Sequence, residues 1–277
     1  MIASTWDDWL PRAVEAAEPS GVDIWYLGCN GFILKASDGT TIFIDPYLGT
    51  GSPPRTIRMI PIPFDPMDIQ ECDGILVSHG HTDHMHGPSQ APILGATASS
   101  LYASKAALNV AFQEEDWLSE WAVTDDQLID VEEGDQFEIG PFTIDVGTAH
   151  DPDAEEPLSF VIQHDAGTVF HGGDTKPTEA FAQLGDAYDI DLAIVAIGSV
   201  GNLYDGEITA RQRTRWYCDE NQAIEIANLL QADRLFPSHW DMWKGVGADP
   251  TALTKHATSW PYPRHVEIGE IGDRIEL

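Results

Sequence analysis

Positive charge is the scarcest property of this sequence. Only 14 of its 277 residues are lysine or arginine, against 46 aspartates and glutamates, so the formal net charge is −32. The acids are spread along the whole chain and do not form a tail. Because no basic groove is available to displace the counterions of a phosphate backbone, we expect no nucleic-acid partner.

Long apolar runs and paired cysteines are also missing. No stretch approaches the ~20 apolar residues of a membrane span, and no basic segment precedes an apolar run at the start of the chain. We therefore expect a cytoplasmic protein without a membrane partner. Cys29, Cys72 and Cys218 are odd in number and widely spaced. This pattern argues against a disulfide framework and against a thiolate zinc site.

The order of the expected elements favours one α/β domain over residues 1–277, with a helical extension over residues 1–20. Strand-like runs occur at Asp23–Leu27, Phe32–Ala36, Thr41–Asp45, Gly74–Ser78, Gln127–Val131, Phe137–Ile139, Phe142–Val146, Leu158–Gln163, Thr168–Phe170, Asp191–Ile197 and Arg234–Pro237. Helical patterns cover Ser4–Glu18, Ser104–Glu115, Thr175–Leu184, Asp219–Leu230 and Thr251–Thr258. This order predicts sheets packed on each other with helices outside. The proline-rich residues 49–66 predict a long loop that lines the functional site.

A dense group of histidines follows the predicted strand Gly74–Ser78. The sequence there is Ser-His-Gly-His-Thr-Asp-His-Met-His, from Ser78 to His86. Four imidazoles this close would repel one another when protonated, whereas a bound cation satisfies all of them. Imidazole and carboxylate groups suit zinc and neighbouring transition metals. A histidine tract that binds metal only adventitiously is the alternative.

Three further metal-binding residue types follow later predicted strands. They are His150, Asp174 and His239. Taken singly, they fit a loop histidine, an acid at a helix N-terminus and an interface residue. Together with the cluster they supply five histidines and two aspartates, which is enough for two metal ions.

The order of these residues is similar to the motif set of the metallo-β-lactamase superfamily, over roughly residues 22 to 277. The resemblance implies a four-layer αβ/βα sandwich with two mixed β-sheets and helices outside. It places a first metal at His79, His81 and His150, a second metal at Asp83, His84 and His239, and Asp174 as a bridge between them. Asp45 resembles the buried aspartate that this superfamily holds behind its site.

Within that superfamily the sequence most resembles the ascorbate-6-phosphate lactonases, the UlaG-like group. The supporting stretches are Trp25–Gly31, His171–Thr175, Ile197–Ser199 and Pro237–Trp243. The loop after His150 is short, and the sequence from Pro88 onward departs from that group. This resemblance implies hydrolysis of a small ester, lactone or phosphorylated metabolite.

Two divalent ions, zinc or manganese with zinc favoured by the imidazole count, would lower the pKa of a bridging water. The resulting hydroxide would attack the substrate, and we predict that Asp83 orients it as a catalytic residue. His171 and His86 are two further imidazoles. One could donate a proton to the leaving group and the other could support a ligand. We predict the catalytic role for His171, with a structural role open for both.

Arginines are concentrated in one segment. Arg211, Arg213 and Arg215 fall within five residues, and alternation would place their guanidinium groups on one side of an extended chain. Such groups bind phosphate or carboxylate in two-point contacts. We predict that they bind a small-molecule substrate, with an anionic group as one option. A salt-bridged strand, or a contact between subunits of a homo-oligomer, explains the same pattern.

Two other functions use the same ligand motif. A phosphodiesterase or nuclease of this fold is opposed by the charge of −32. A non-catalytic metal-binding scaffold is opposed by the complete ligand set.

The acidic composition resembles that of proteins from salt-accumulating haloarchaea. We expect the melting temperature to rise steeply as potassium chloride goes from millimolar to molar concentration. Salt weakens the repulsion between surface carboxylates, because the Debye length falls to ~3 Å at 1 M. Thermal unfolding followed by circular dichroism measures this effect. A melting temperature that stays flat across the series would contradict the halophilic assignment.

Overall fold

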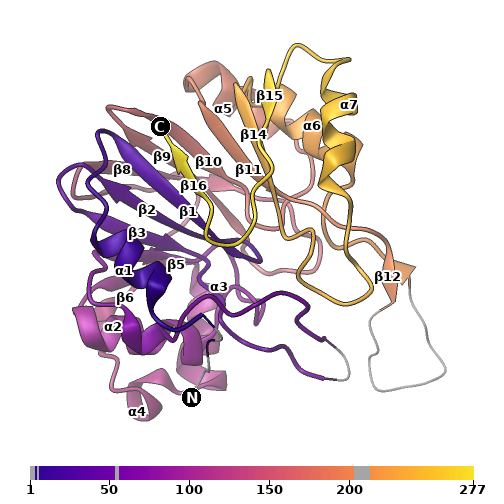
Figure 1. The fold of residues 1–277 in the computed structure, drawn as a ribbon. Helices are drawn as coiled ribbons and strands as arrows, with labels where there is room; N and C mark the ends of the chain where they lie inside the picture. Colours follow the sequence, from indigo (N-terminus) through magenta and orange to yellow (C-terminus); the bar gives the residue numbers. More distant parts are fainter. Residues whose placement is uncertain (1–3, 5, 54–55, 203–212) are drawn as a thin grey trace.

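The computed structural model describes residue 4 and residues 6–53, 56–202 and 213–277. Two seven-stranded sheets dominate this part of the chain (Figure 1). The first sheet has the strand order β16 (Arg274–Glu276), β1 (Val22–Gly28), β2 (Gly31–Ala36), β3 (Thr41–Ile44), β4 (Gly74–Leu76), β5 (Ser100–Ala103) and β6 (Leu128–Asp130). Strands β16 to β3 pair antiparallel and β3 to β6 pair parallel, so the sheet is mixed.

The second sheet is mixed in the same way. Its order is β15 (His265–Val266), β14 (Arg234–Ser238), β11 (Leu192–Ala196), β10 (Gly167–His171), β9 (Leu158–His164), β8 (Phe142–Thr148) and β7 (Gln136–Ile139). Strands β7 to β10 pair antiparallel, and β10, β11, β14 and β15 pair parallel. A separate two-stranded pair joins β12 (Gly201–Asn202) to β13 (Arg213–Thr214).

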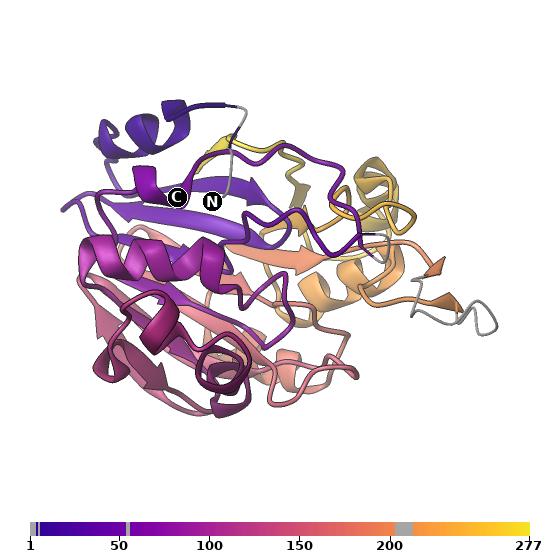
Figure 2. The same cartoon turned by 90° about the horizontal axis from the view of Figure 1, so that it is seen from below.

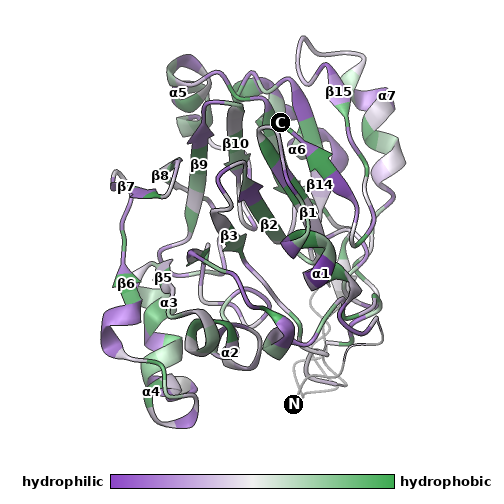
Figure 3. Cartoon of the chain, turned by 60° about the vertical axis from the view of Figure 1, so that its left-hand side comes forward, coloured by the Kyte–Doolittle hydropathy of each residue, from purple (hydrophilic) through white to green (hydrophobic). Residues whose placement is uncertain are grey.

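Each sheet carries apolar side chains on both of its faces. This explains why the strand sequences are continuous hydrophobic runs. In β1, Ile24 and Tyr26 enter the core between the two sheets, whereas Trp25 and Leu27 enter the core on the outer face. This is the two-residue alternation of an extended chain. Phe160 and Phe236 reach the inner core from the second sheet. Figure 3 shows the resulting concentration of hydrophobic colour on the central strands.

Helices cover the two outer faces. Their bounds are α1 (Trp9–Glu15), α2 (Gly87–Thr97), α3 (Lys105–Asn109), α4 (Trp117–Glu120), α5 (Ala180–Ala187), α6 (Glu220–Leu229) and α7 (Leu253–Ala257). Side chains of the first four pack with the outer face of the first sheet, and those of the last three pack with the second sheet (Figures 1 and 2). The expected four-layer α/β sandwich is therefore confirmed.

Two helix predictions were wrong in extent. Thr175–Leu184 was expected to be helical, but α5 begins only at Ala180 because the residues before it form a loop after β10. The predicted helix Ser104–Glu115 divides into α3 and a π-helical turn at Val110–Glu114. Helix α2 was missed, because Pro88 and Pro92 look like helix breakers although Pro88 occupies the first turn, where proline is tolerated.

Six strands of the two sheets run in the same sense and deliver their carboxyl ends to one end of the sandwich. The loops that follow β1, β3, β4, β8, β10 and β14 all contribute to the polar contacts described below. Of the helices in the described residues, none is long and apolar enough to cross a membrane.

Candidate metal centre and cavity

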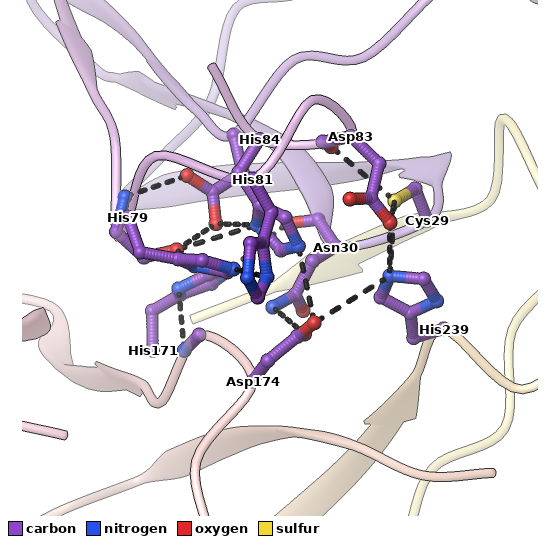
Figure 4. Close-up of polar contacts among 12 residues, drawn as sticks. Cys29, Asn30, His79, His81, Asp83, His84, His171, Asp174 and His239 are labelled. Carbon is purple, nitrogen blue, oxygen red and sulfur yellow. Dashed lines mark hydrogen bonds and ion pairs between the residues drawn. The ribbon is translucent and has the colours of Figure 1, made fainter. Parts of the chain in front are cut away.

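Two groups of metal-binding side chains lie side by side at this end of the sandwich (Figure 4). The first contains His79, His81, Asp151 and Asp174, and the second contains Cys29, Asp83, His84 and His239. Within each group, one donor atom from every residue lies within 4.8 Å of the others.

The first group is held together by short contacts from three loops. His79 Nε2 lies 2.9 Å from His81 Nδ1, and both nitrogens lie 3.6 Å from Asp151 Oδ2. His81 Nε2 donates to the backbone carbonyl of Asp153 at 3.3 Å, and the tautomer with this bond presents Nδ1 to the group as an acceptor. Burial lowers the pKa of His79 to about 3, so its imidazole is neutral at pH 7.

The second group is equally close. His239 Nε2 lies 3.2 Å from Asp83 Oδ2 and 3.3 Å from Cys29 Sγ. Asp174 Oδ2 lies 3.3 Å from His84 Nε2 and 3.9 Å from His239 Nε2. Asp174, a member of the first group, therefore also faces two histidines of the second group.

A buried hydrogen-bond network holds the imidazoles from behind. Asp45 is fully buried and accepts the backbone N–H of Ser78 at 2.8 Å through Oδ1. Its Oδ2 accepts Ser78 Oγ at 2.6 Å and His84 Nδ1 at 2.8 Å. Since the Ser78 proton goes to Asp45, Ser78 Oγ accepts from His79 Nδ1 at 3.0 Å. Both histidines thus keep Nε2 free to face the groups.

The electrostatics of the centre favour a cation. Burial alone would raise the pKa of Asp45 and lower that of His84, but their mutual attraction lowers the first, and Asp174 together with Asp45 raises the second well above its usual value. Asp83 has its pKa held well below the usual range despite burial, through His239 and His84. The field that would keep a proton on His84 would equally hold a metal ion in its place.

The buried geometry itself fits metal ions. His84 Nε2 is buried and forms no hydrogen bond with the described residues, although Asp174 Oδ2 lies only 3.3 Å away. Four donors around one tetrahedral ion, at bond lengths of ~2.0–2.3 Å, would be separated by ~3.3–3.8 Å. The spacings of 3.2, 3.3 and 3.6 Å found here are close to that range.

Close backbone approach fixes the position of Asp174. Gly173 has a φ angle of +58°, and a Cβ atom there would lie 2.9 Å from Ser78 Cβ, so a side chain would be both strained and crowded. On the other side, Asn30 Nδ2 donates to Asp174 Oδ1 at 3.5 Å, while Asn30 Oδ1 accepts from Ser238 Oγ at 2.6 Å.

His150 is not brought into either group, contrary to the ligand role expected for it. Its side chain is exposed, while its backbone N–H donates to Thr175 Oγ1 at 2.8 Å and its carbonyl accepts from Lys176. The next residue, Asp151, is buried and points toward His79 and His81 instead. The donor that this loop brings to the first group is therefore the residue next to the predicted one.

His171 lies behind the two groups, in the position of a support, which is the structural alternative left open for it. It is fully buried, with Nε2 donating to the carbonyl of Asn30 at 3.0 Å and Nδ1 accepting from the N–H of Gly173 at 3.3 Å. Both ring nitrogens are therefore engaged away from the cavity. These two bonds hold the neighbours of Cys29 and Asp174.

The arginine segment is only partly described. Arg211 lies outside the described residues, and Arg213 is described only through its backbone in β13. Arg215 is half-buried, and its Nη1 donates to the carbonyl of Gly198 at 2.7 Å. Its neighbours Trp216 and Tyr217 reach the cavity wall. The substrate-binding role stays a prediction for all three arginines.

A cavity of about 570 Å³ opens in front of the two groups. Its described lining combines metal-centre residues and nearby acids with aromatic rings: Tyr47, Gly51, Ser52, Thr56, His81, Thr82, Asp83, His86, Asp151, Asp153, Asp174, Trp216, Tyr217, Trp243 and Val246. Loop 49–66 thus contributes to the site, as expected. Burial lowers the pKa of His86 to about 4, and its Nδ1 lies 2.6 Å from Ser89 Oγ, so it enters the wall as a neutral imidazole.

Aromatic residues of the wall touch the ligands directly. Trp243 Nε1 donates to Asp83 Oδ2 at 3.0 Å, and the Tyr217 ring stacks on His239 with centroids 4.1 Å apart. Residues 57–59 pair with the segment around Trp243, through an Arg58–Trp243 bridge and a Met59 N–H bond to the Met242 carbonyl of 2.8 Å. Trp243 therefore connects the loop, through its backbone, to the candidate ligand Asp83, through its indole.

Sequence reasoning missed Cys29 and Asp151. Cys29 was read as an ordinary thiol, although it sits in the turn directly after β1, at the end where other donors follow strands. Asp151 was overlooked because its neighbour His150 matched the expected residue type. Both residues closely follow the end of a strand, and this position was the sequence signal that could have identified them as donors.

The comparisons with known proteins agree with this geometry. The beta-lactamase superfamily domain matches residues 40–240. The "Probable L-ascorbate-6-phosphate lactonase UlaG" of Escherichia fergusonii is 24% identical over 293 residues, which cover 90% of this chain and 78% of that protein.

Solved structures share the fold. Igni18, a metallo hydrolase from the archaeon Ignicoccus hospitalis, superposes with a TM-score of 0.66 at 20% identity, covering 92% of this chain and 98% of that one. A possible metal-dependent hydrolase from Veillonella parvula gives a TM-score of 0.68 at 15% identity, covering 93% and 100%. Since the matched residues 40–240 contain most of both donor groups, this chain belongs to the metallo-β-lactamase superfamily.

Proposed function

We propose that the protein is a metal-dependent hydrolase that cleaves an ester or lactone bond in a small molecule. The observation that carries this proposal is the pair of donor groups that meet at Asp174 on the floor of the cavity. The UlaG lactonases, related over 90% of the chain, support the bond type.

Zinc is the proposed metal, with manganese as the second option. The ligands predicted from the sequence contain more imidazoles than carboxylates, which favours zinc. When bound, two divalent ions supply an acidified water as nucleophile and an electrophile for the group under attack. His79, His81, Asp151 and Asp174 would hold one ion, and Asp83, His84 and His239 the other, with Asp174 between them.

The protein's own residues would orient the reaction. Asp83 faces the cavity and is fixed by the indole of Trp243, so it can align an attacking water without moving. His86 faces the same space as a neutral imidazole and could hydrogen-bond to substrate. The rings of Tyr47, Trp216 and Trp243 offer an apolar wall for a ring or an acyl group.

The charge of the substrate is the least constrained feature. Acids line the cavity at Asp83, Asp151, Asp153 and Asp174, and none of its described lining residues is lysine or arginine. This supports a neutral ester or lactone once the metal charges are balanced by their ligands. A phosphorylated substrate would need the Arg211–Arg215 segment at the mouth of the cavity.

The metal requirement is tested by removing ligands. We expect His81→Ala and Asp174→Ala each to lower turnover of lactones and esters by more than the ~10–100-fold typical of losing an outer partner. The fold, followed by circular dichroism, should stay intact, and Glu133→Ala on the exposed surface is the matched control. A chelator-treated, metal-free protein that keeps full activity would overturn the hydrolase proposal.

The assignment of Asp151 is tested by comparing neighbours. Asp151→Ala should lower the metal content from two ions per chain toward one, because it removes a buried carboxylate from the first group. His150→Ala should keep both ions, since its side chain is exposed. Metal analysis of the purified variants measures this. The reverse result would restore His150 as the ligand.

The arginine segment is tested with substrates of different charge. Arg213→Ala and Arg215→Ala should raise KM strongly for phosphorylated lactones and little for neutral ones, if the segment captures an anionic group. Steady-state kinetics on matched pairs of substrates provides the measurement. Equal effects on both substrates, or a change only in oligomer size, would show that the arginines are structural.

A further inference from the structure

We propose that Cys29 is a thiolate ligand of the second metal ion, so that the two metal positions differ in chemical softness. The proposal rests on the metal centre described under the proposed function. It adds a ligand type, and a difference between the two positions, that the histidine and aspartate motifs do not contain.

The backbone around Cys29 directs its side chain into the centre. Cys29 occupies the turn between β1 and β2 with a φ angle of +56° and is fully buried. Its carbonyl accepts from the N–H of His239 at 2.8 Å and from the hydroxyl of Tyr26 at 3.1 Å. The first bond joins the turn to the residue after β14, the second ties it back to β1, and the thiol faces the second group.

The distances suit coordination. Cys29 Sγ lies 3.3 Å from His239 Nε2 and 4.0 Å from Asp83 Oδ2 (Figure 4). Around a tetrahedral ion, a sulfur at ~2.3 Å and a nitrogen at ~2.0 Å would be ~3.5 Å apart. The distance from Cys29 Sγ to His239 Nε2 is thus close to that between two ligands of one tetrahedral ion.

The other two thiols lack this environment. Cys72 Sγ donates to the carbonyl of Gly74 at 3.5 Å, and Cys218 Sγ donates to the carbonyl of Thr175 at 3.1 Å. Both are buried, as Cys29 is, but neither belongs to a donor group. Burial of a thiol alone therefore does not explain the position of Cys29.

An independent atom also points to a cation in this group. His84 Nε2 is buried without a hydrogen bond to any described residue, while Nδ1 of the same ring is engaged by Asp45. His84 shares the second group with Cys29, so the missing partner and the thiol face the same small space. The competing explanation is a neutral thiol that donates to the Asp83 carbonyl, 3.5 Å away.

Thiolate ligation makes the two positions chemically different. The first group offers two imidazoles and two carboxylates, whereas the second adds a soft sulfur to Asp83 and two imidazoles. Thiolate favours zinc over manganese, so the second position would select zinc more strongly. On binding, the S–H bond breaks, a sulfur–metal bond forms, and the proton passes to water.

Cobalt(II) is the probe that tests the proposal, because thiolate bound to cobalt gives a charge-transfer band in the near ultraviolet. Chelator-treated full-length protein is loaded with cobalt and compared with Cys29→Ser, Cys72→Ser and Cys218→Ser. We expect the band in the unmodified protein and in the two control variants, and its loss in Cys29→Ser. With zinc and manganese supplied together, Cys29→Ser should also retain a lower zinc-to-manganese ratio.

Each result has a distinct meaning. Unmodified protein that binds cobalt without the band overturns the role of Cys29 and leaves the metal centre standing. Protein that binds no cobalt at all overturns the metal centre itself. If Cys29→Ser does not fold, the band in the unmodified protein, and its persistence in both control variants, still assign the thiolate to Cys29.

Discussion

The buried carboxylate of Asp45 is the contact on which the centre depends. It lies at the end of β3 and accepts three hydrogen bonds, from the backbone and hydroxyl of Ser78 and from His84. A buried charge is stable only when its hydrogen bonds are made, so these bonds fix the loop after β4 relative to β3. They also fix which imidazole nitrogens face the metal positions. The strained backbone of Asp45, with a φ angle of +42°, shows that the fold tolerates a local cost at this point.

The centre concentrates negative charge in a chain that already has an excess of it. Asp45, Asp83, Asp151 and Asp174 are gathered in one small region, and three of them line the cavity. The imidazole of His79 does not help to neutralise this cluster, because burial lowers its pKa to about 3 and keeps it uncharged. Divalent ions would supply the missing positive charge inside the protein. Repulsion between exposed acids, in contrast, is the kind of interaction that dissolved salt screens.

The strands, and most residues of the two donor groups, were predictable from the sequence because they depend on local pattern. The apolar runs around Ile24 and Phe160 needed no tertiary information, and the spacing from His79 to His84 fixed one loop of the site. Helix α2 was not predictable, since its tertiary packing outweighs Pro92. Whether His150 or Asp151 faces the first group depends on the conformation of the loop after β8. The position of Cys29 near the second group depends on a contact between the turn after β1, in the first sheet, and the residue after β14, in the second sheet. Neither is encoded in residue type alone. The single-domain, halophilic and cytoplasmic assignments stay predictions from composition and pattern.

Trp243 contacts both the candidate metal centre and the rim of the cavity. The indole nitrogen donates to the carboxylate of Asp83, and the backbone of Trp243 pairs with the loop that forms the cavity rim. A change in the conformation of that loop would therefore be transmitted to Asp83, a candidate metal ligand, through Trp243. In evolutionary terms, the shape of the cavity rim and the geometry of the candidate metal centre are coupled at this one residue.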